Sequence, residues 1–408
     1  MIVLVLNCGG SSVKYQIFDL EQDIVICKGM TERIGQGGSA LTHSVVGRDK
    51  AEILHDMPDH GAALALILET VADPHIGAIR TISEIGAVGH RVVHAGERYN
   101  GSVLITDDVV DAVEQCAELA PLHNPPNLLG IRACRALMPD VPQVAVFDNA
   151  FHRDLPDHVR PYAIPYEYYQ KYGVRRYGFH GVAFQSMTEQ ASAILGVPLE
   201  ALRLVSLMLG SGTTANAFKH GRSVEVSTGF TPCEGLVQST RCGDIDPAVV
   251  TWLMKKEGLS ADEMDTILYK KSGWLGISGV SADMRDVKAA ANSGSLRAKL
   301  AIDAFAHRAR KYVGAYAATM GGVDALVFSG GIGEREAGIR ASICEGLEFM
   351  GIEIDEAKNA AHVGRPGIIS PDGAVAKVVV VMLDEESVIA RDTYRIAAAL
   401  SAQQGAPA

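Results

Sequence analysis

Short apolar runs that end in glycine-rich polar turns recur along this chain. Residues 2–6 are apolar, which predicts a buried β-strand, and the alternating residues 13–18 predict a second strand. The turn between them, residues 7–12, reads Asn-Cys-Gly-Gly-Ser-Ser, and Lys14 follows it. Glycine lets backbone N–H groups converge on an anion, hydroxyl groups add donors, and lysine adds positive charge. This turn is therefore either a phosphate-facing loop or a plain hairpin.

A second segment repeats the pattern about half a chain later. The mostly apolar residues 204–209 enter the turn 210–214, Gly-Ser-Gly-Thr-Thr, and the alternating residues 215–218 follow. Residues 145–148 and 326–329 also echo each other, because each is an apolar run that ends in a polar turn. A chance likeness of β-rich segments is the alternative. The two echoes favour a duplicated domain with two phosphate-facing hairpins.

The remaining pattern alternates strands with helices. Further strands are expected at residues 23–29, 85–94, 144–147, 324–329 and 375–382, and helices at residues 61–72, 106–117, 128–137, 184–195 and 387–399. Residues 35–60 and 121–127 are expected to be connections, and Leu296 and Leu300 to face inward from a long amphipathic helix. Hairpins followed by alternating helices and strands, twice over, predict an α/β fold with mixed sheets.

Composition narrows the class of protein. The chain has 408 residues, 48% hydrophobic and 21% charged, which fits two globular domains. Its net charge of −11 argues against nucleic acid and anionic membranes as partners. Every strongly apolar run is too short to span a membrane. Seven scattered cysteines without a CxxC pair favour reduced thiols in a cytoplasmic enzyme.

Several familiar site motifs are absent or out of context. No Walker loop is present, and the GxGxxA spacing at residues 210–215 leads into an alternating strand where a dinucleotide site needs a helix. His90 and His94 lack the glutamate that a zinc HExxH motif requires, since Arg91 stands there. Residues 330–333 do run from a strand into a helix, where N–H groups and the helix dipole favour a phosphate. A plain strand–helix turn is the alternative there.

Charged and polar side chains follow several of these strands and turns. They are Arg91, His123, Asp148, His180, Arg241, Asp283, Arg285 and Glu385. Each alone is ordinary for a surface or a helix cap, but together with three anion-shaped turns they fit phosphoryl transfer. That reaction needs cations on the equatorial oxygens, a metal and in-line positioning. A carboxylate and an amide suit Mg²⁺, which takes few protein ligands.

Nine segments together resemble the acetate and propionate kinases. They are residues 7–14 (NCGGSSVK), 89–94 (GHRVVH), 120–126 (APLHNPP), 146–152 (VFDNAFH), 177–181 (YGFHG), 240–247 (TRCGDIDP), 281–285 (SADMR), 330–334 (GGIGE) and 384–392 (DEESVIARD). The resemblance runs from residue 2 to about residue 393. It implies the actin-like ATPase fold of sugar kinases, with two RNase H-like domains, nucleotide and substrate in the cleft between them, and a homodimer. We expect residues 1–150 plus 386–408 in the first domain, and residues 151–385, carrying most of the nucleotide site, in the second.

The same resemblance implies the site residues. Arg91, Asp148, His180 and Arg241 are expected to be catalytic. Arg91, Val93, Leu122, His123, Phe179 and Pro232 are expected to bind the acyl substrate. The nucleotide, ATP or ADP, is expected to contact Lys14, Met208, Leu209, Gly210, Ser211, Gly212, Asp283, Met284, Arg285, Gly331, Ile332, Gly333, Glu334 and Arg335. Asn7 and Glu385 are expected to position Mg²⁺, with Mn²⁺ as an alternative.

The sequence departs from the family mainly in the second hairpin. The family usually has His-Leu-Gly-Asn-Gly-Ala-Ser there, whereas residues 208–214 read Met-Leu-Gly-Ser-Gly-Thr-Thr. Reversible phosphorylation of acetate by ATP is the activity that the resemblance implies. A propionate or other short-chain acyl kinase, a donor such as pyrophosphate, and a nucleotide-binding protein without turnover are alternatives. Val93 favours acetate, because a smaller residue there admits another methylene.

Overall fold

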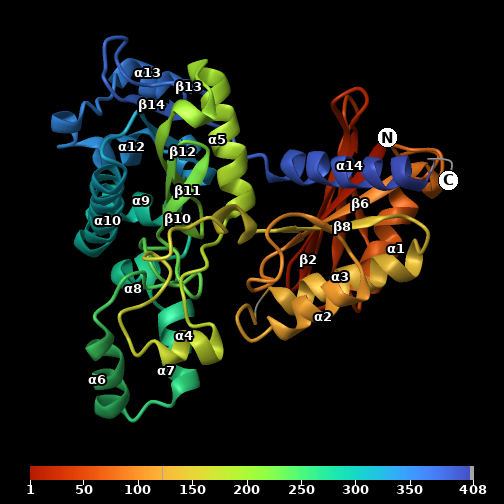
Figure 1. The fold of residues 1–408 in the computed structure, drawn as a ribbon, viewed down its shortest axis with the longest axis horizontal. Coiled ribbons are helices and arrows are strands. Elements are labelled where there is room, and N and C mark those ends of the chain that lie inside the picture. Colours follow the sequence, from red (N-terminus) through yellow and green to blue (C-terminus); the bar gives the residue numbers. More distant parts are fainter. Residues whose placement is uncertain (122, 405–408) are drawn as a thin grey trace. The chain divides into compact units, whose positions relative to one another are not determined.

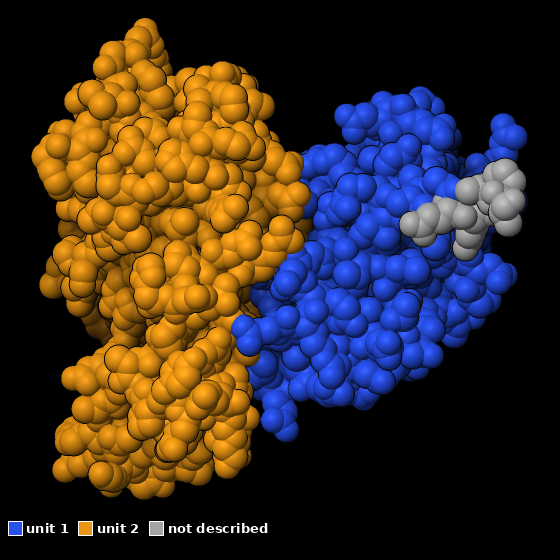
Figure 2. Space-filling view, in the orientation of Figure 1, with its two compact units in different colours: residues 1–150, 384–408 blue, residues 151–383 orange. Residues whose placement is uncertain are grey.

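The computed structural model describes residues 1–121 and 123–404, which fold into two compact units (Figures 1 and 2). Unit 1 holds the described residues of Met1–Ala150 and Asp384–Ala408, and unit 2 holds Phe151–Leu383. None of the described helices combines the length and the apolarity that crossing a membrane requires.

Unit 1 is one mixed sheet with helices on both faces. Its strands are β1 (Ile2–Cys8), β2 (Ser12–Asp19), β3 (Ile24–Glu32), β4 (Ala40–Val45), β5 (Ala51–Leu54), β6 (Ile85–Val92), β7 (Val103–Leu104) and β8 (Gln143–Phe147). Its helices are α1 (His60–Val71), η1 (Ile82–Glu84), α2 (Asp107–Gln115), α3 (Asn124–Leu137) and α14 (Glu385–Gln404). The strand order is β5-β4-β3-β2-β1-β6-β8-β7, and α14 covers the face opposite α1 and α3 (Figure 1).

Unit 2 repeats this plan with a shorter sheet. Its strands are β9 (Arg203–Leu209), β10 (Thr213–Lys219), β11 (Arg222–Val226), β12 (Ala325–Ser329), β13 (Gly367–Ile368) and β14 (Lys377–Val380). Its helices are α4 (Glu167–Tyr172), α5 (Gly181–Leu195), η3 (Leu199–Ala201), α6 (Pro247–Glu257), α7 (Ala261–Lys270), α8 (Gly273–Ser278), α9 (Met284–Asn292), α10 (Leu296–Met320), α11 (Gly330–Arg335), α12 (Ala337–Cys344), η4 (Glu348–Met350) and α13 (Glu356–Ala361), and the short η2 (Ala150–His152) precedes them. The strand order is β11-β10-β9-β12-β14-β13.

The two sheets share a five-strand core. In unit 1, β3, β2 and β1 run antiparallel to one another, and β6 and β8 continue in parallel with β1. In unit 2, β11, β10 and β9 are antiparallel, and β12 and β14 continue in parallel with β9. The predicted duplicated α/β fold with mixed sheets is therefore confirmed.

Alternating side chains of β9 explain why its sheet is covered on both faces. Val205, Leu207 and Leu209 enter the core formed with α8, α9 and α10. Leu204 and Met208 enter the core formed with α5. This alternation follows from the two-residue period of a strand, and it explains why apolar residues occupy both faces of β9, with Ser206 as the polar exception among residues 204–209.

Gly89 on β6 decides how closely α14 packs in unit 1. A Cβ atom at Gly89 would lie 2.3 Å from Thr393 Oγ1 and 2.8 Å from Ile389 Cγ2, both on α14. Only glycine therefore permits this approach. The close packing brings the first residue of α14, Glu385, to the carboxyl end of β6.

The prediction that residues 35–60 form only connections is wrong. Residues 40–45 and 51–54 form the antiparallel strands β4 and β5 at the sheet edge. The buried His43 on β4 shares a 2.6 Å hydrogen bond with the hydroxyl of Tyr15 on β2. A polar residue on the inward face hid this strand from a reading based on apolar alternation.

Two further expectations need correction. Residues 124–127 are not part of a connection, because α3 begins at Asn124 and places its two prolines in the first turn, where no backbone N–H is required. Leu296 and Leu300 do not face inward, since 83% and 58% of their surfaces are exposed. The buried face of α10 instead runs through Ala298, Ala301 and Phe305. Small residues on that face let α10 pack closely against α8 and α9.

Candidate active site

Arg91 and Asp148 form a two-point ion pair at the carboxyl ends of β6 and β8. Arg91 Nη2 donates to Asp148 Oδ2 at 2.6 Å, and Arg91 Nε donates to Oδ1 at 3.3 Å. The parallel register pairs Arg91 with Val146, so two strands far apart in sequence deliver the two groups to one edge. Asp148 is only 2% exposed. Such a bidentate pair fixes the plane of the guanidinium as well as its position.

A second carboxylate lies beside this pair. Glu385 Oε1 is 3.8 Å from Arg91 Nη2. Burial raises the pKa of Glu385, Arg91 lowers it, and the neighbouring Asp148 and Glu386 carboxylates raise it further. Burial by itself would lower the pKa of Arg91, but Asp148 and Glu385 hold it above its ordinary value. Negative charge therefore gathers around one arginine at this edge of unit 1.

The expected Mg²⁺ ligands fit a cation held by few protein groups. Asn7 is half-buried on β1 and pairs directly with Lys14 on β2, while Glu385 opens α14 in the same unit. No cluster of three or more His, Cys, Asp or Glu side chains suited to a metal occurs among the described residues. Mg²⁺ keeps several waters and takes one or two carboxylates plus substrate phosphates, so a sparse ligand set suits it.

Asn127 contacts two of the expected site segments, and the sequence reading did not single it out. Its Oδ1 accepts a 3.2 Å hydrogen bond from the backbone N–H of Val93, and its Nδ2 donates to Cys8 O at 2.9 Å. It thereby ties the first glycine-rich turn to the expected acyl-binding residue Val93. His123 immediately precedes the same helix, α3. The expected acyl-binding residue Leu122 lies outside the described residues.

His180 holds a special backbone position in unit 2. It lies directly before α5 with a left-handed φ of 59°. Its Nδ1 shares a 2.9 Å hydrogen bond with Thr214 Oγ1 on β10. A Cβ at Gly212 would come within 3.2 Å of the imidazole, so the second glycine-rich turn closely approaches this ring. A left-handed non-glycine residue costs free energy, and such positions concentrate at functional sites.

Phe179 and Pro232, the unit 2 residues expected to bind the acyl group, belong to two different loops. Phe179 is buried, and its backbone N–H donates to Thr228 Oγ1 at 3.0 Å. Pro232 is half-buried, and its carbonyl accepts a 2.6 Å hydrogen bond from Gln238 Nε2.

Gln238 connects three of the expected site segments and was also missed. Besides Pro232 O, it contacts Arg241, whose Nη1 donates to Gln238 Oε1 at 3.2 Å. The same Oε1 accepts a 3.4 Å hydrogen bond from Thr213 N in the second glycine-rich turn. Burial lowers the pKa of Arg241, yet a guanidinium stays charged in proteins. The sign of this role in the sequence was the amide side chain of Gln238, three residues before Arg241.

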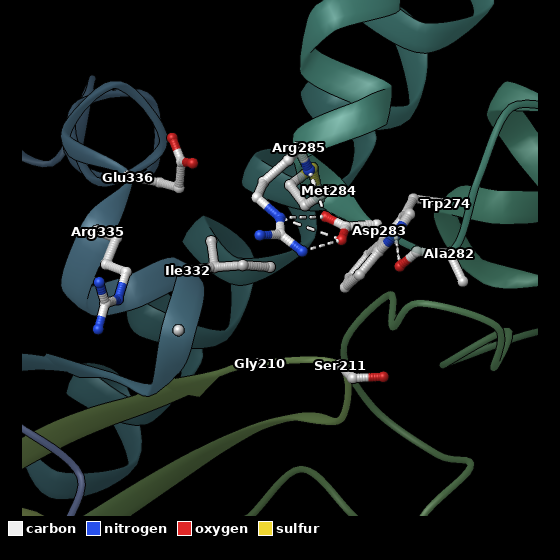
Figure 3. Close-up of a pocket in the computed structure, with 11 residues that line it drawn as sticks. Gly210, Ser211, Trp274, Ala282, Asp283, Met284, Arg285, Ile332, Arg335 and Glu336 are labelled. Carbon is white, nitrogen blue, oxygen red and sulfur yellow. Dashed lines mark hydrogen bonds and ion pairs between the residues drawn. The ribbon is translucent and has the colours of Figure 1, made fainter. Parts of the chain in front are cut away.

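A cavity of about 550 Å³ in unit 2 gathers many of the expected nucleotide residues (Figure 3). Its lining contains eight of them, namely Gly210, Ser211, Asp283, Met284, Arg285, Gly331, Ile332 and Arg335. Trp274, Ala282 and Glu336 complete the lining and were not expected. Asp283 caps α9, and its Oδ2 accepts a 2.5 Å hydrogen bond from Arg285 Nη2. The cavity thus presents an oriented guanidinium beside apolar and glycine surfaces.

The other expected nucleotide residues do not line this cavity. Met208 and Leu209 are buried in the cores on opposite faces of the sheet. The carboxylate of Glu334 accepts hydrogen bonds from Ser329 Oγ at 3.3 Å, Gly330 N at 3.2 Å and Leu383 N at 2.9 Å. Glu334 therefore satisfies the backbone N–H of Gly330, the first residue of the turn that was expected to offer free N–H groups. Gly212 and Gly333 are outside the lining too, and Lys14 belongs to unit 1.

Known proteins resemble this chain along nearly its whole length. The model of the Acetokinase family matches residues 2–391. The chain is 48% identical over 396 residues to the acetate kinase of Desulfitobacterium hafniense (strain DSM 10664 / DCB-2), covering 97% of this chain and 99% of that protein. It is 51% identical over 397 residues to the acetate kinase of Caldanaerobacter subterraneus subsp. tengcongensis, with the same coverage of 97% and 99%.

Solved structures show the same likeness. Porphyromonas gingivalis acetate kinase superimposes with a TM-score of 0.93 at 46% identity, covering 97% of this chain and 99% of that chain. A propionate kinase from Francisella tularensis superimposes with a TM-score of 0.90 at 36% identity and the same coverage of 97% and 99%.

Proposed function

Because this chain belongs to the acetokinase family, we propose that it transfers the γ-phosphoryl group of ATP to acetate and catalyses the reverse reaction. The observation that carries this proposal is the two-point contact between Arg91 and Asp148. A guanidinium held rigidly beside buried carboxylates is suited to bind one anion, the acceptor carboxylate. It can also bring that anion close to a second one, the phosphoryl group. Acetate kinase is also the activity of the relatives that the chain matches along nearly its whole length.

The chemistry requires charge compensation rather than a strong base. Acetate is already ionised at neutral pH, since carboxyl groups titrate near pH 4, so no residue has to deprotonate it. The barrier arises from repulsion between its carboxylate and the phosphoryl oxygens. We assign Arg91 to the acceptor carboxylate and the phosphoryl group, and Asp148 to the orientation of Arg91. Bidentate guanidinium contacts supply both charge and direction.

We assign Arg241 and His180 to the phosphoryl group in the transition state. In a loose transition state the charge spreads over three equatorial oxygens, and positioned donors stabilise it. Gln238 orients the Arg241 guanidinium, and Thr214 orients the His180 imidazole. His123 is assigned a further donor role near the acceptor.

The nucleotide is proposed to bind in the cavity lined by Gly210, Asp283, Arg285 and Ile332. Its volume of about 550 Å³ suits a small ligand. Mg²⁺, or Mn²⁺ in its place, would be held by Asn7 and Glu385 together with waters and phosphate oxygens. The metal would neutralise phosphate charge. A cytoplasmic homodimer completes the proposal and stays a prediction.

A hydroxamate trap for acyl phosphate tests this function. The purified chain should form acetyl hydroxamate from acetate, ATP and MgCl₂, with a higher kcat/KM for acetate than for propionate or butyrate. EDTA should abolish the signal, and MnCl₂ should restore it. Pyrophosphate, tested as donor under the same conditions, should give a much lower rate. Absence of acyl phosphate with every carboxylate, or a higher kcat/KM for pyrophosphate than for ATP, would contradict the proposal.

A further inference from the structure

Two cysteines lie in contact beside the proposed catalytic arginine. Cys233 Sγ and Cys242 Sγ are 3.6 Å apart and share a hydrogen bond. Cys233 follows Pro232 and Cys242 follows Arg241, so each thiol adjoins one expected site residue. The phosphoryl-transfer chemistry proposed above uses neither thiol.

Helix α7 holds the two cysteines together. The carbonyl of Leu268 accepts a 3.0 Å hydrogen bond from the backbone N–H of Cys242, and Cys233 Sγ lies 3.8 Å from the same oxygen. Both cysteines are half-buried, whereas Cys8, Cys27, Cys134 and Cys344 are buried. The pair is therefore fixed in position and less enclosed than most thiols of this chain.

We infer that Cys233 and Cys242 are a reversible oxidation site, at which a hydroperoxide forms a disulfide that slows phosphoryl transfer. The geometry favours this bond because the sulfur atoms must approach by only about 1.5 Å to reach a disulfide length near 2.05 Å. The segment between them contains Gly235, which has a left-handed φ of 104°, and no regular helix or strand. Such a segment can absorb a small movement.

The two steps of the oxidation balance without any further reactant. The Cys242 thiolate attacks one oxygen of hydrogen peroxide, the O–O bond breaks, and the released hydroxide takes a proton to become water. Cys233 then attacks the sulfur of the resulting sulfenic acid, the S–O bond breaks, and the Cys233 proton leaves with the hydroxide as a second water. Two thiols and one peroxide thus give one disulfide and two waters.

Cys242 is the better nucleophile of the two. The hydrogen bond from Cys233 lowers the pKa of Cys242, and Arg308 contributes in the same direction. The same hydrogen bond raises the pKa of Cys233, and burial adds to this effect. Because the thiolate is the reactive form, this polarisation assigns Cys242 the attack on peroxide and leaves Cys233 to resolve the sulfenic acid.

The effect on turnover follows from the neighbours of the pair, and this part rests on the proposed function. Pulling Cys233 and Cys242 together moves the backbone on either side of Gln238, which binds both Pro232 O and the Arg241 guanidinium. A displacement of about 1 Å of a positioning group can cost about 100-fold in rate. We expect the oxidised protein to lose at least tenfold in kcat.

The test uses the full chain treated with hydrogen peroxide. Mass spectrometry of the intact protein should show a loss of two hydrogens, and a peptide map should locate a bond between Cys233 and Cys242. The kcat for acetate should fall at least tenfold and return with dithiothreitol. Cys233→Ser and Cys242→Ser should each prevent the cross-link and the tenfold dithiothreitol-reversible loss, whereas the control Cys116→Ser should behave as wild type.

Each other result has a defined meaning. Peroxide treatment that leaves Cys233 and Cys242 uncross-linked in folded protein overturns the inference. A cross-link without a change in kcat overturns its regulatory part. If the reduced protein forms no acyl phosphate, the proposed function fails, while the cross-link still tests the oxidation site. Cys233→Ala and Cys242→Ala, checked by circular dichroism, replace either serine variant that does not fold.

Discussion

Gln238 Oε1 accepts a hydrogen bond from Arg241 Nη1 at 3.2 Å, while the other end of the same amide donates to Pro232 O. The Gln238 side chain is 1% exposed, so water cannot replace these contacts. A buried amide that binds the guanidinium on one side and the backbone on the other acts as a rigid spacer between two expected site residues.

Gln238→Met should therefore reduce kcat while changing the KM for ATP little. It keeps the length of the side chain but removes the acceptor for Arg241. A hydrogen bond to a charged group contributes about 1.5–3 kcal/mol, which corresponds to a loss of about 10- to 100-fold. The matched control is Gln190→Met, because Gln190 donates to Met382 O in the same unit without contacting a site residue. Equal kcat losses in both variants would refute a positioning role for Gln238.

The pair of Arg91 and Asp148 allows activity to be separated from stability. Arg91→Ala should lower kcat at least about 1,000-fold, judging by arginines in other phosphoryl transfers. It also leaves the buried Asp148 unpaired, which should cost about 3–5 kcal/mol of unfolding free energy. The double variant Arg91→Met/Asp148→Leu should regain stability but not activity. Urea denaturation and the hydroxamate assay measure the two effects. Recovered turnover in the double variant would remove Arg91 from the catalytic assignment.

Val93→Ala should shift the preference of the enzyme toward propionate. Removing two methyl groups enlarges the expected acyl pocket, and one methylene there is worth about 1–3 kcal/mol. We expect the ratio of kcat/KM for propionate to that for acetate to rise about tenfold. Val92→Ala, at the adjacent fully buried position on β6, is the control, and it should lower stability without changing the ratio. An unchanged ratio in Val93→Ala would show that Val93 does not contact the acyl chain.

The second glycine-rich turn departs from the family at residues 208–214, and the roles of its changed residues can be tested one residue at a time. Ser211 lines the proposed nucleotide cavity, and its Oγ shares a 2.9 Å hydrogen bond with Ser239 Oγ. Ser211→Asn should extend a donor into the cavity and lower the KM for ATP severalfold, with the KM for acetate unchanged. Met208 instead lies in the core beside α5, so Met208→His should lower the melting temperature without lowering the KM for ATP. A lower KM for ATP in Met208→His alone would place that side chain at the nucleotide.

The buried His90 should make folding stability depend on pH. Burial lowers the pKa of His90 to about 4, against an ordinary value of 6.5, although its 2.9 Å hydrogen bond with Gln143 opposes the shift. Between these values the unfolded state binds the extra proton. The contribution of neutral His90 to the free energy of unfolding is therefore complete above about pH 6.5, and it is lost as the pH falls toward 4. Urea denaturation from pH 7 to 4 should show this loss, on the order of 3 kcal/mol, and His90→Gln should reduce it. An equal loss of unfolding free energy at low pH in His90→Gln would show that His90 does not cause it.

The sequence by itself determined the elements that local patterns encode. Alternating and apolar runs with glycine-rich ends predicted the two hairpins and the duplication, because strand periodicity and turn chemistry act over a few residues. The motifs around Arg91, Asp148, His180 and Arg241 predicted the family. The pattern failed where an inward-facing polar residue, His43, interrupted the apolar face of β4, and where small alanines rather than Leu296 and Leu300 made the buried face of α10.

Only the tertiary structure decided which of these side chains meet. Arg91 and Asp148 are 57 residues apart, and parallel strand pairing brings them together. Glu334 belongs to a motif that predicts a nucleotide contact, and in the fold its carboxylate accepts a hydrogen bond from Gly330 N at the start of α11. Asn127 and Gln238 gain their roles only through contacts made across the fold. Hydrogen bonds and ion pairs depend on positions within fractions of an ångström, and packing of distant segments sets those positions, which no local pattern contains.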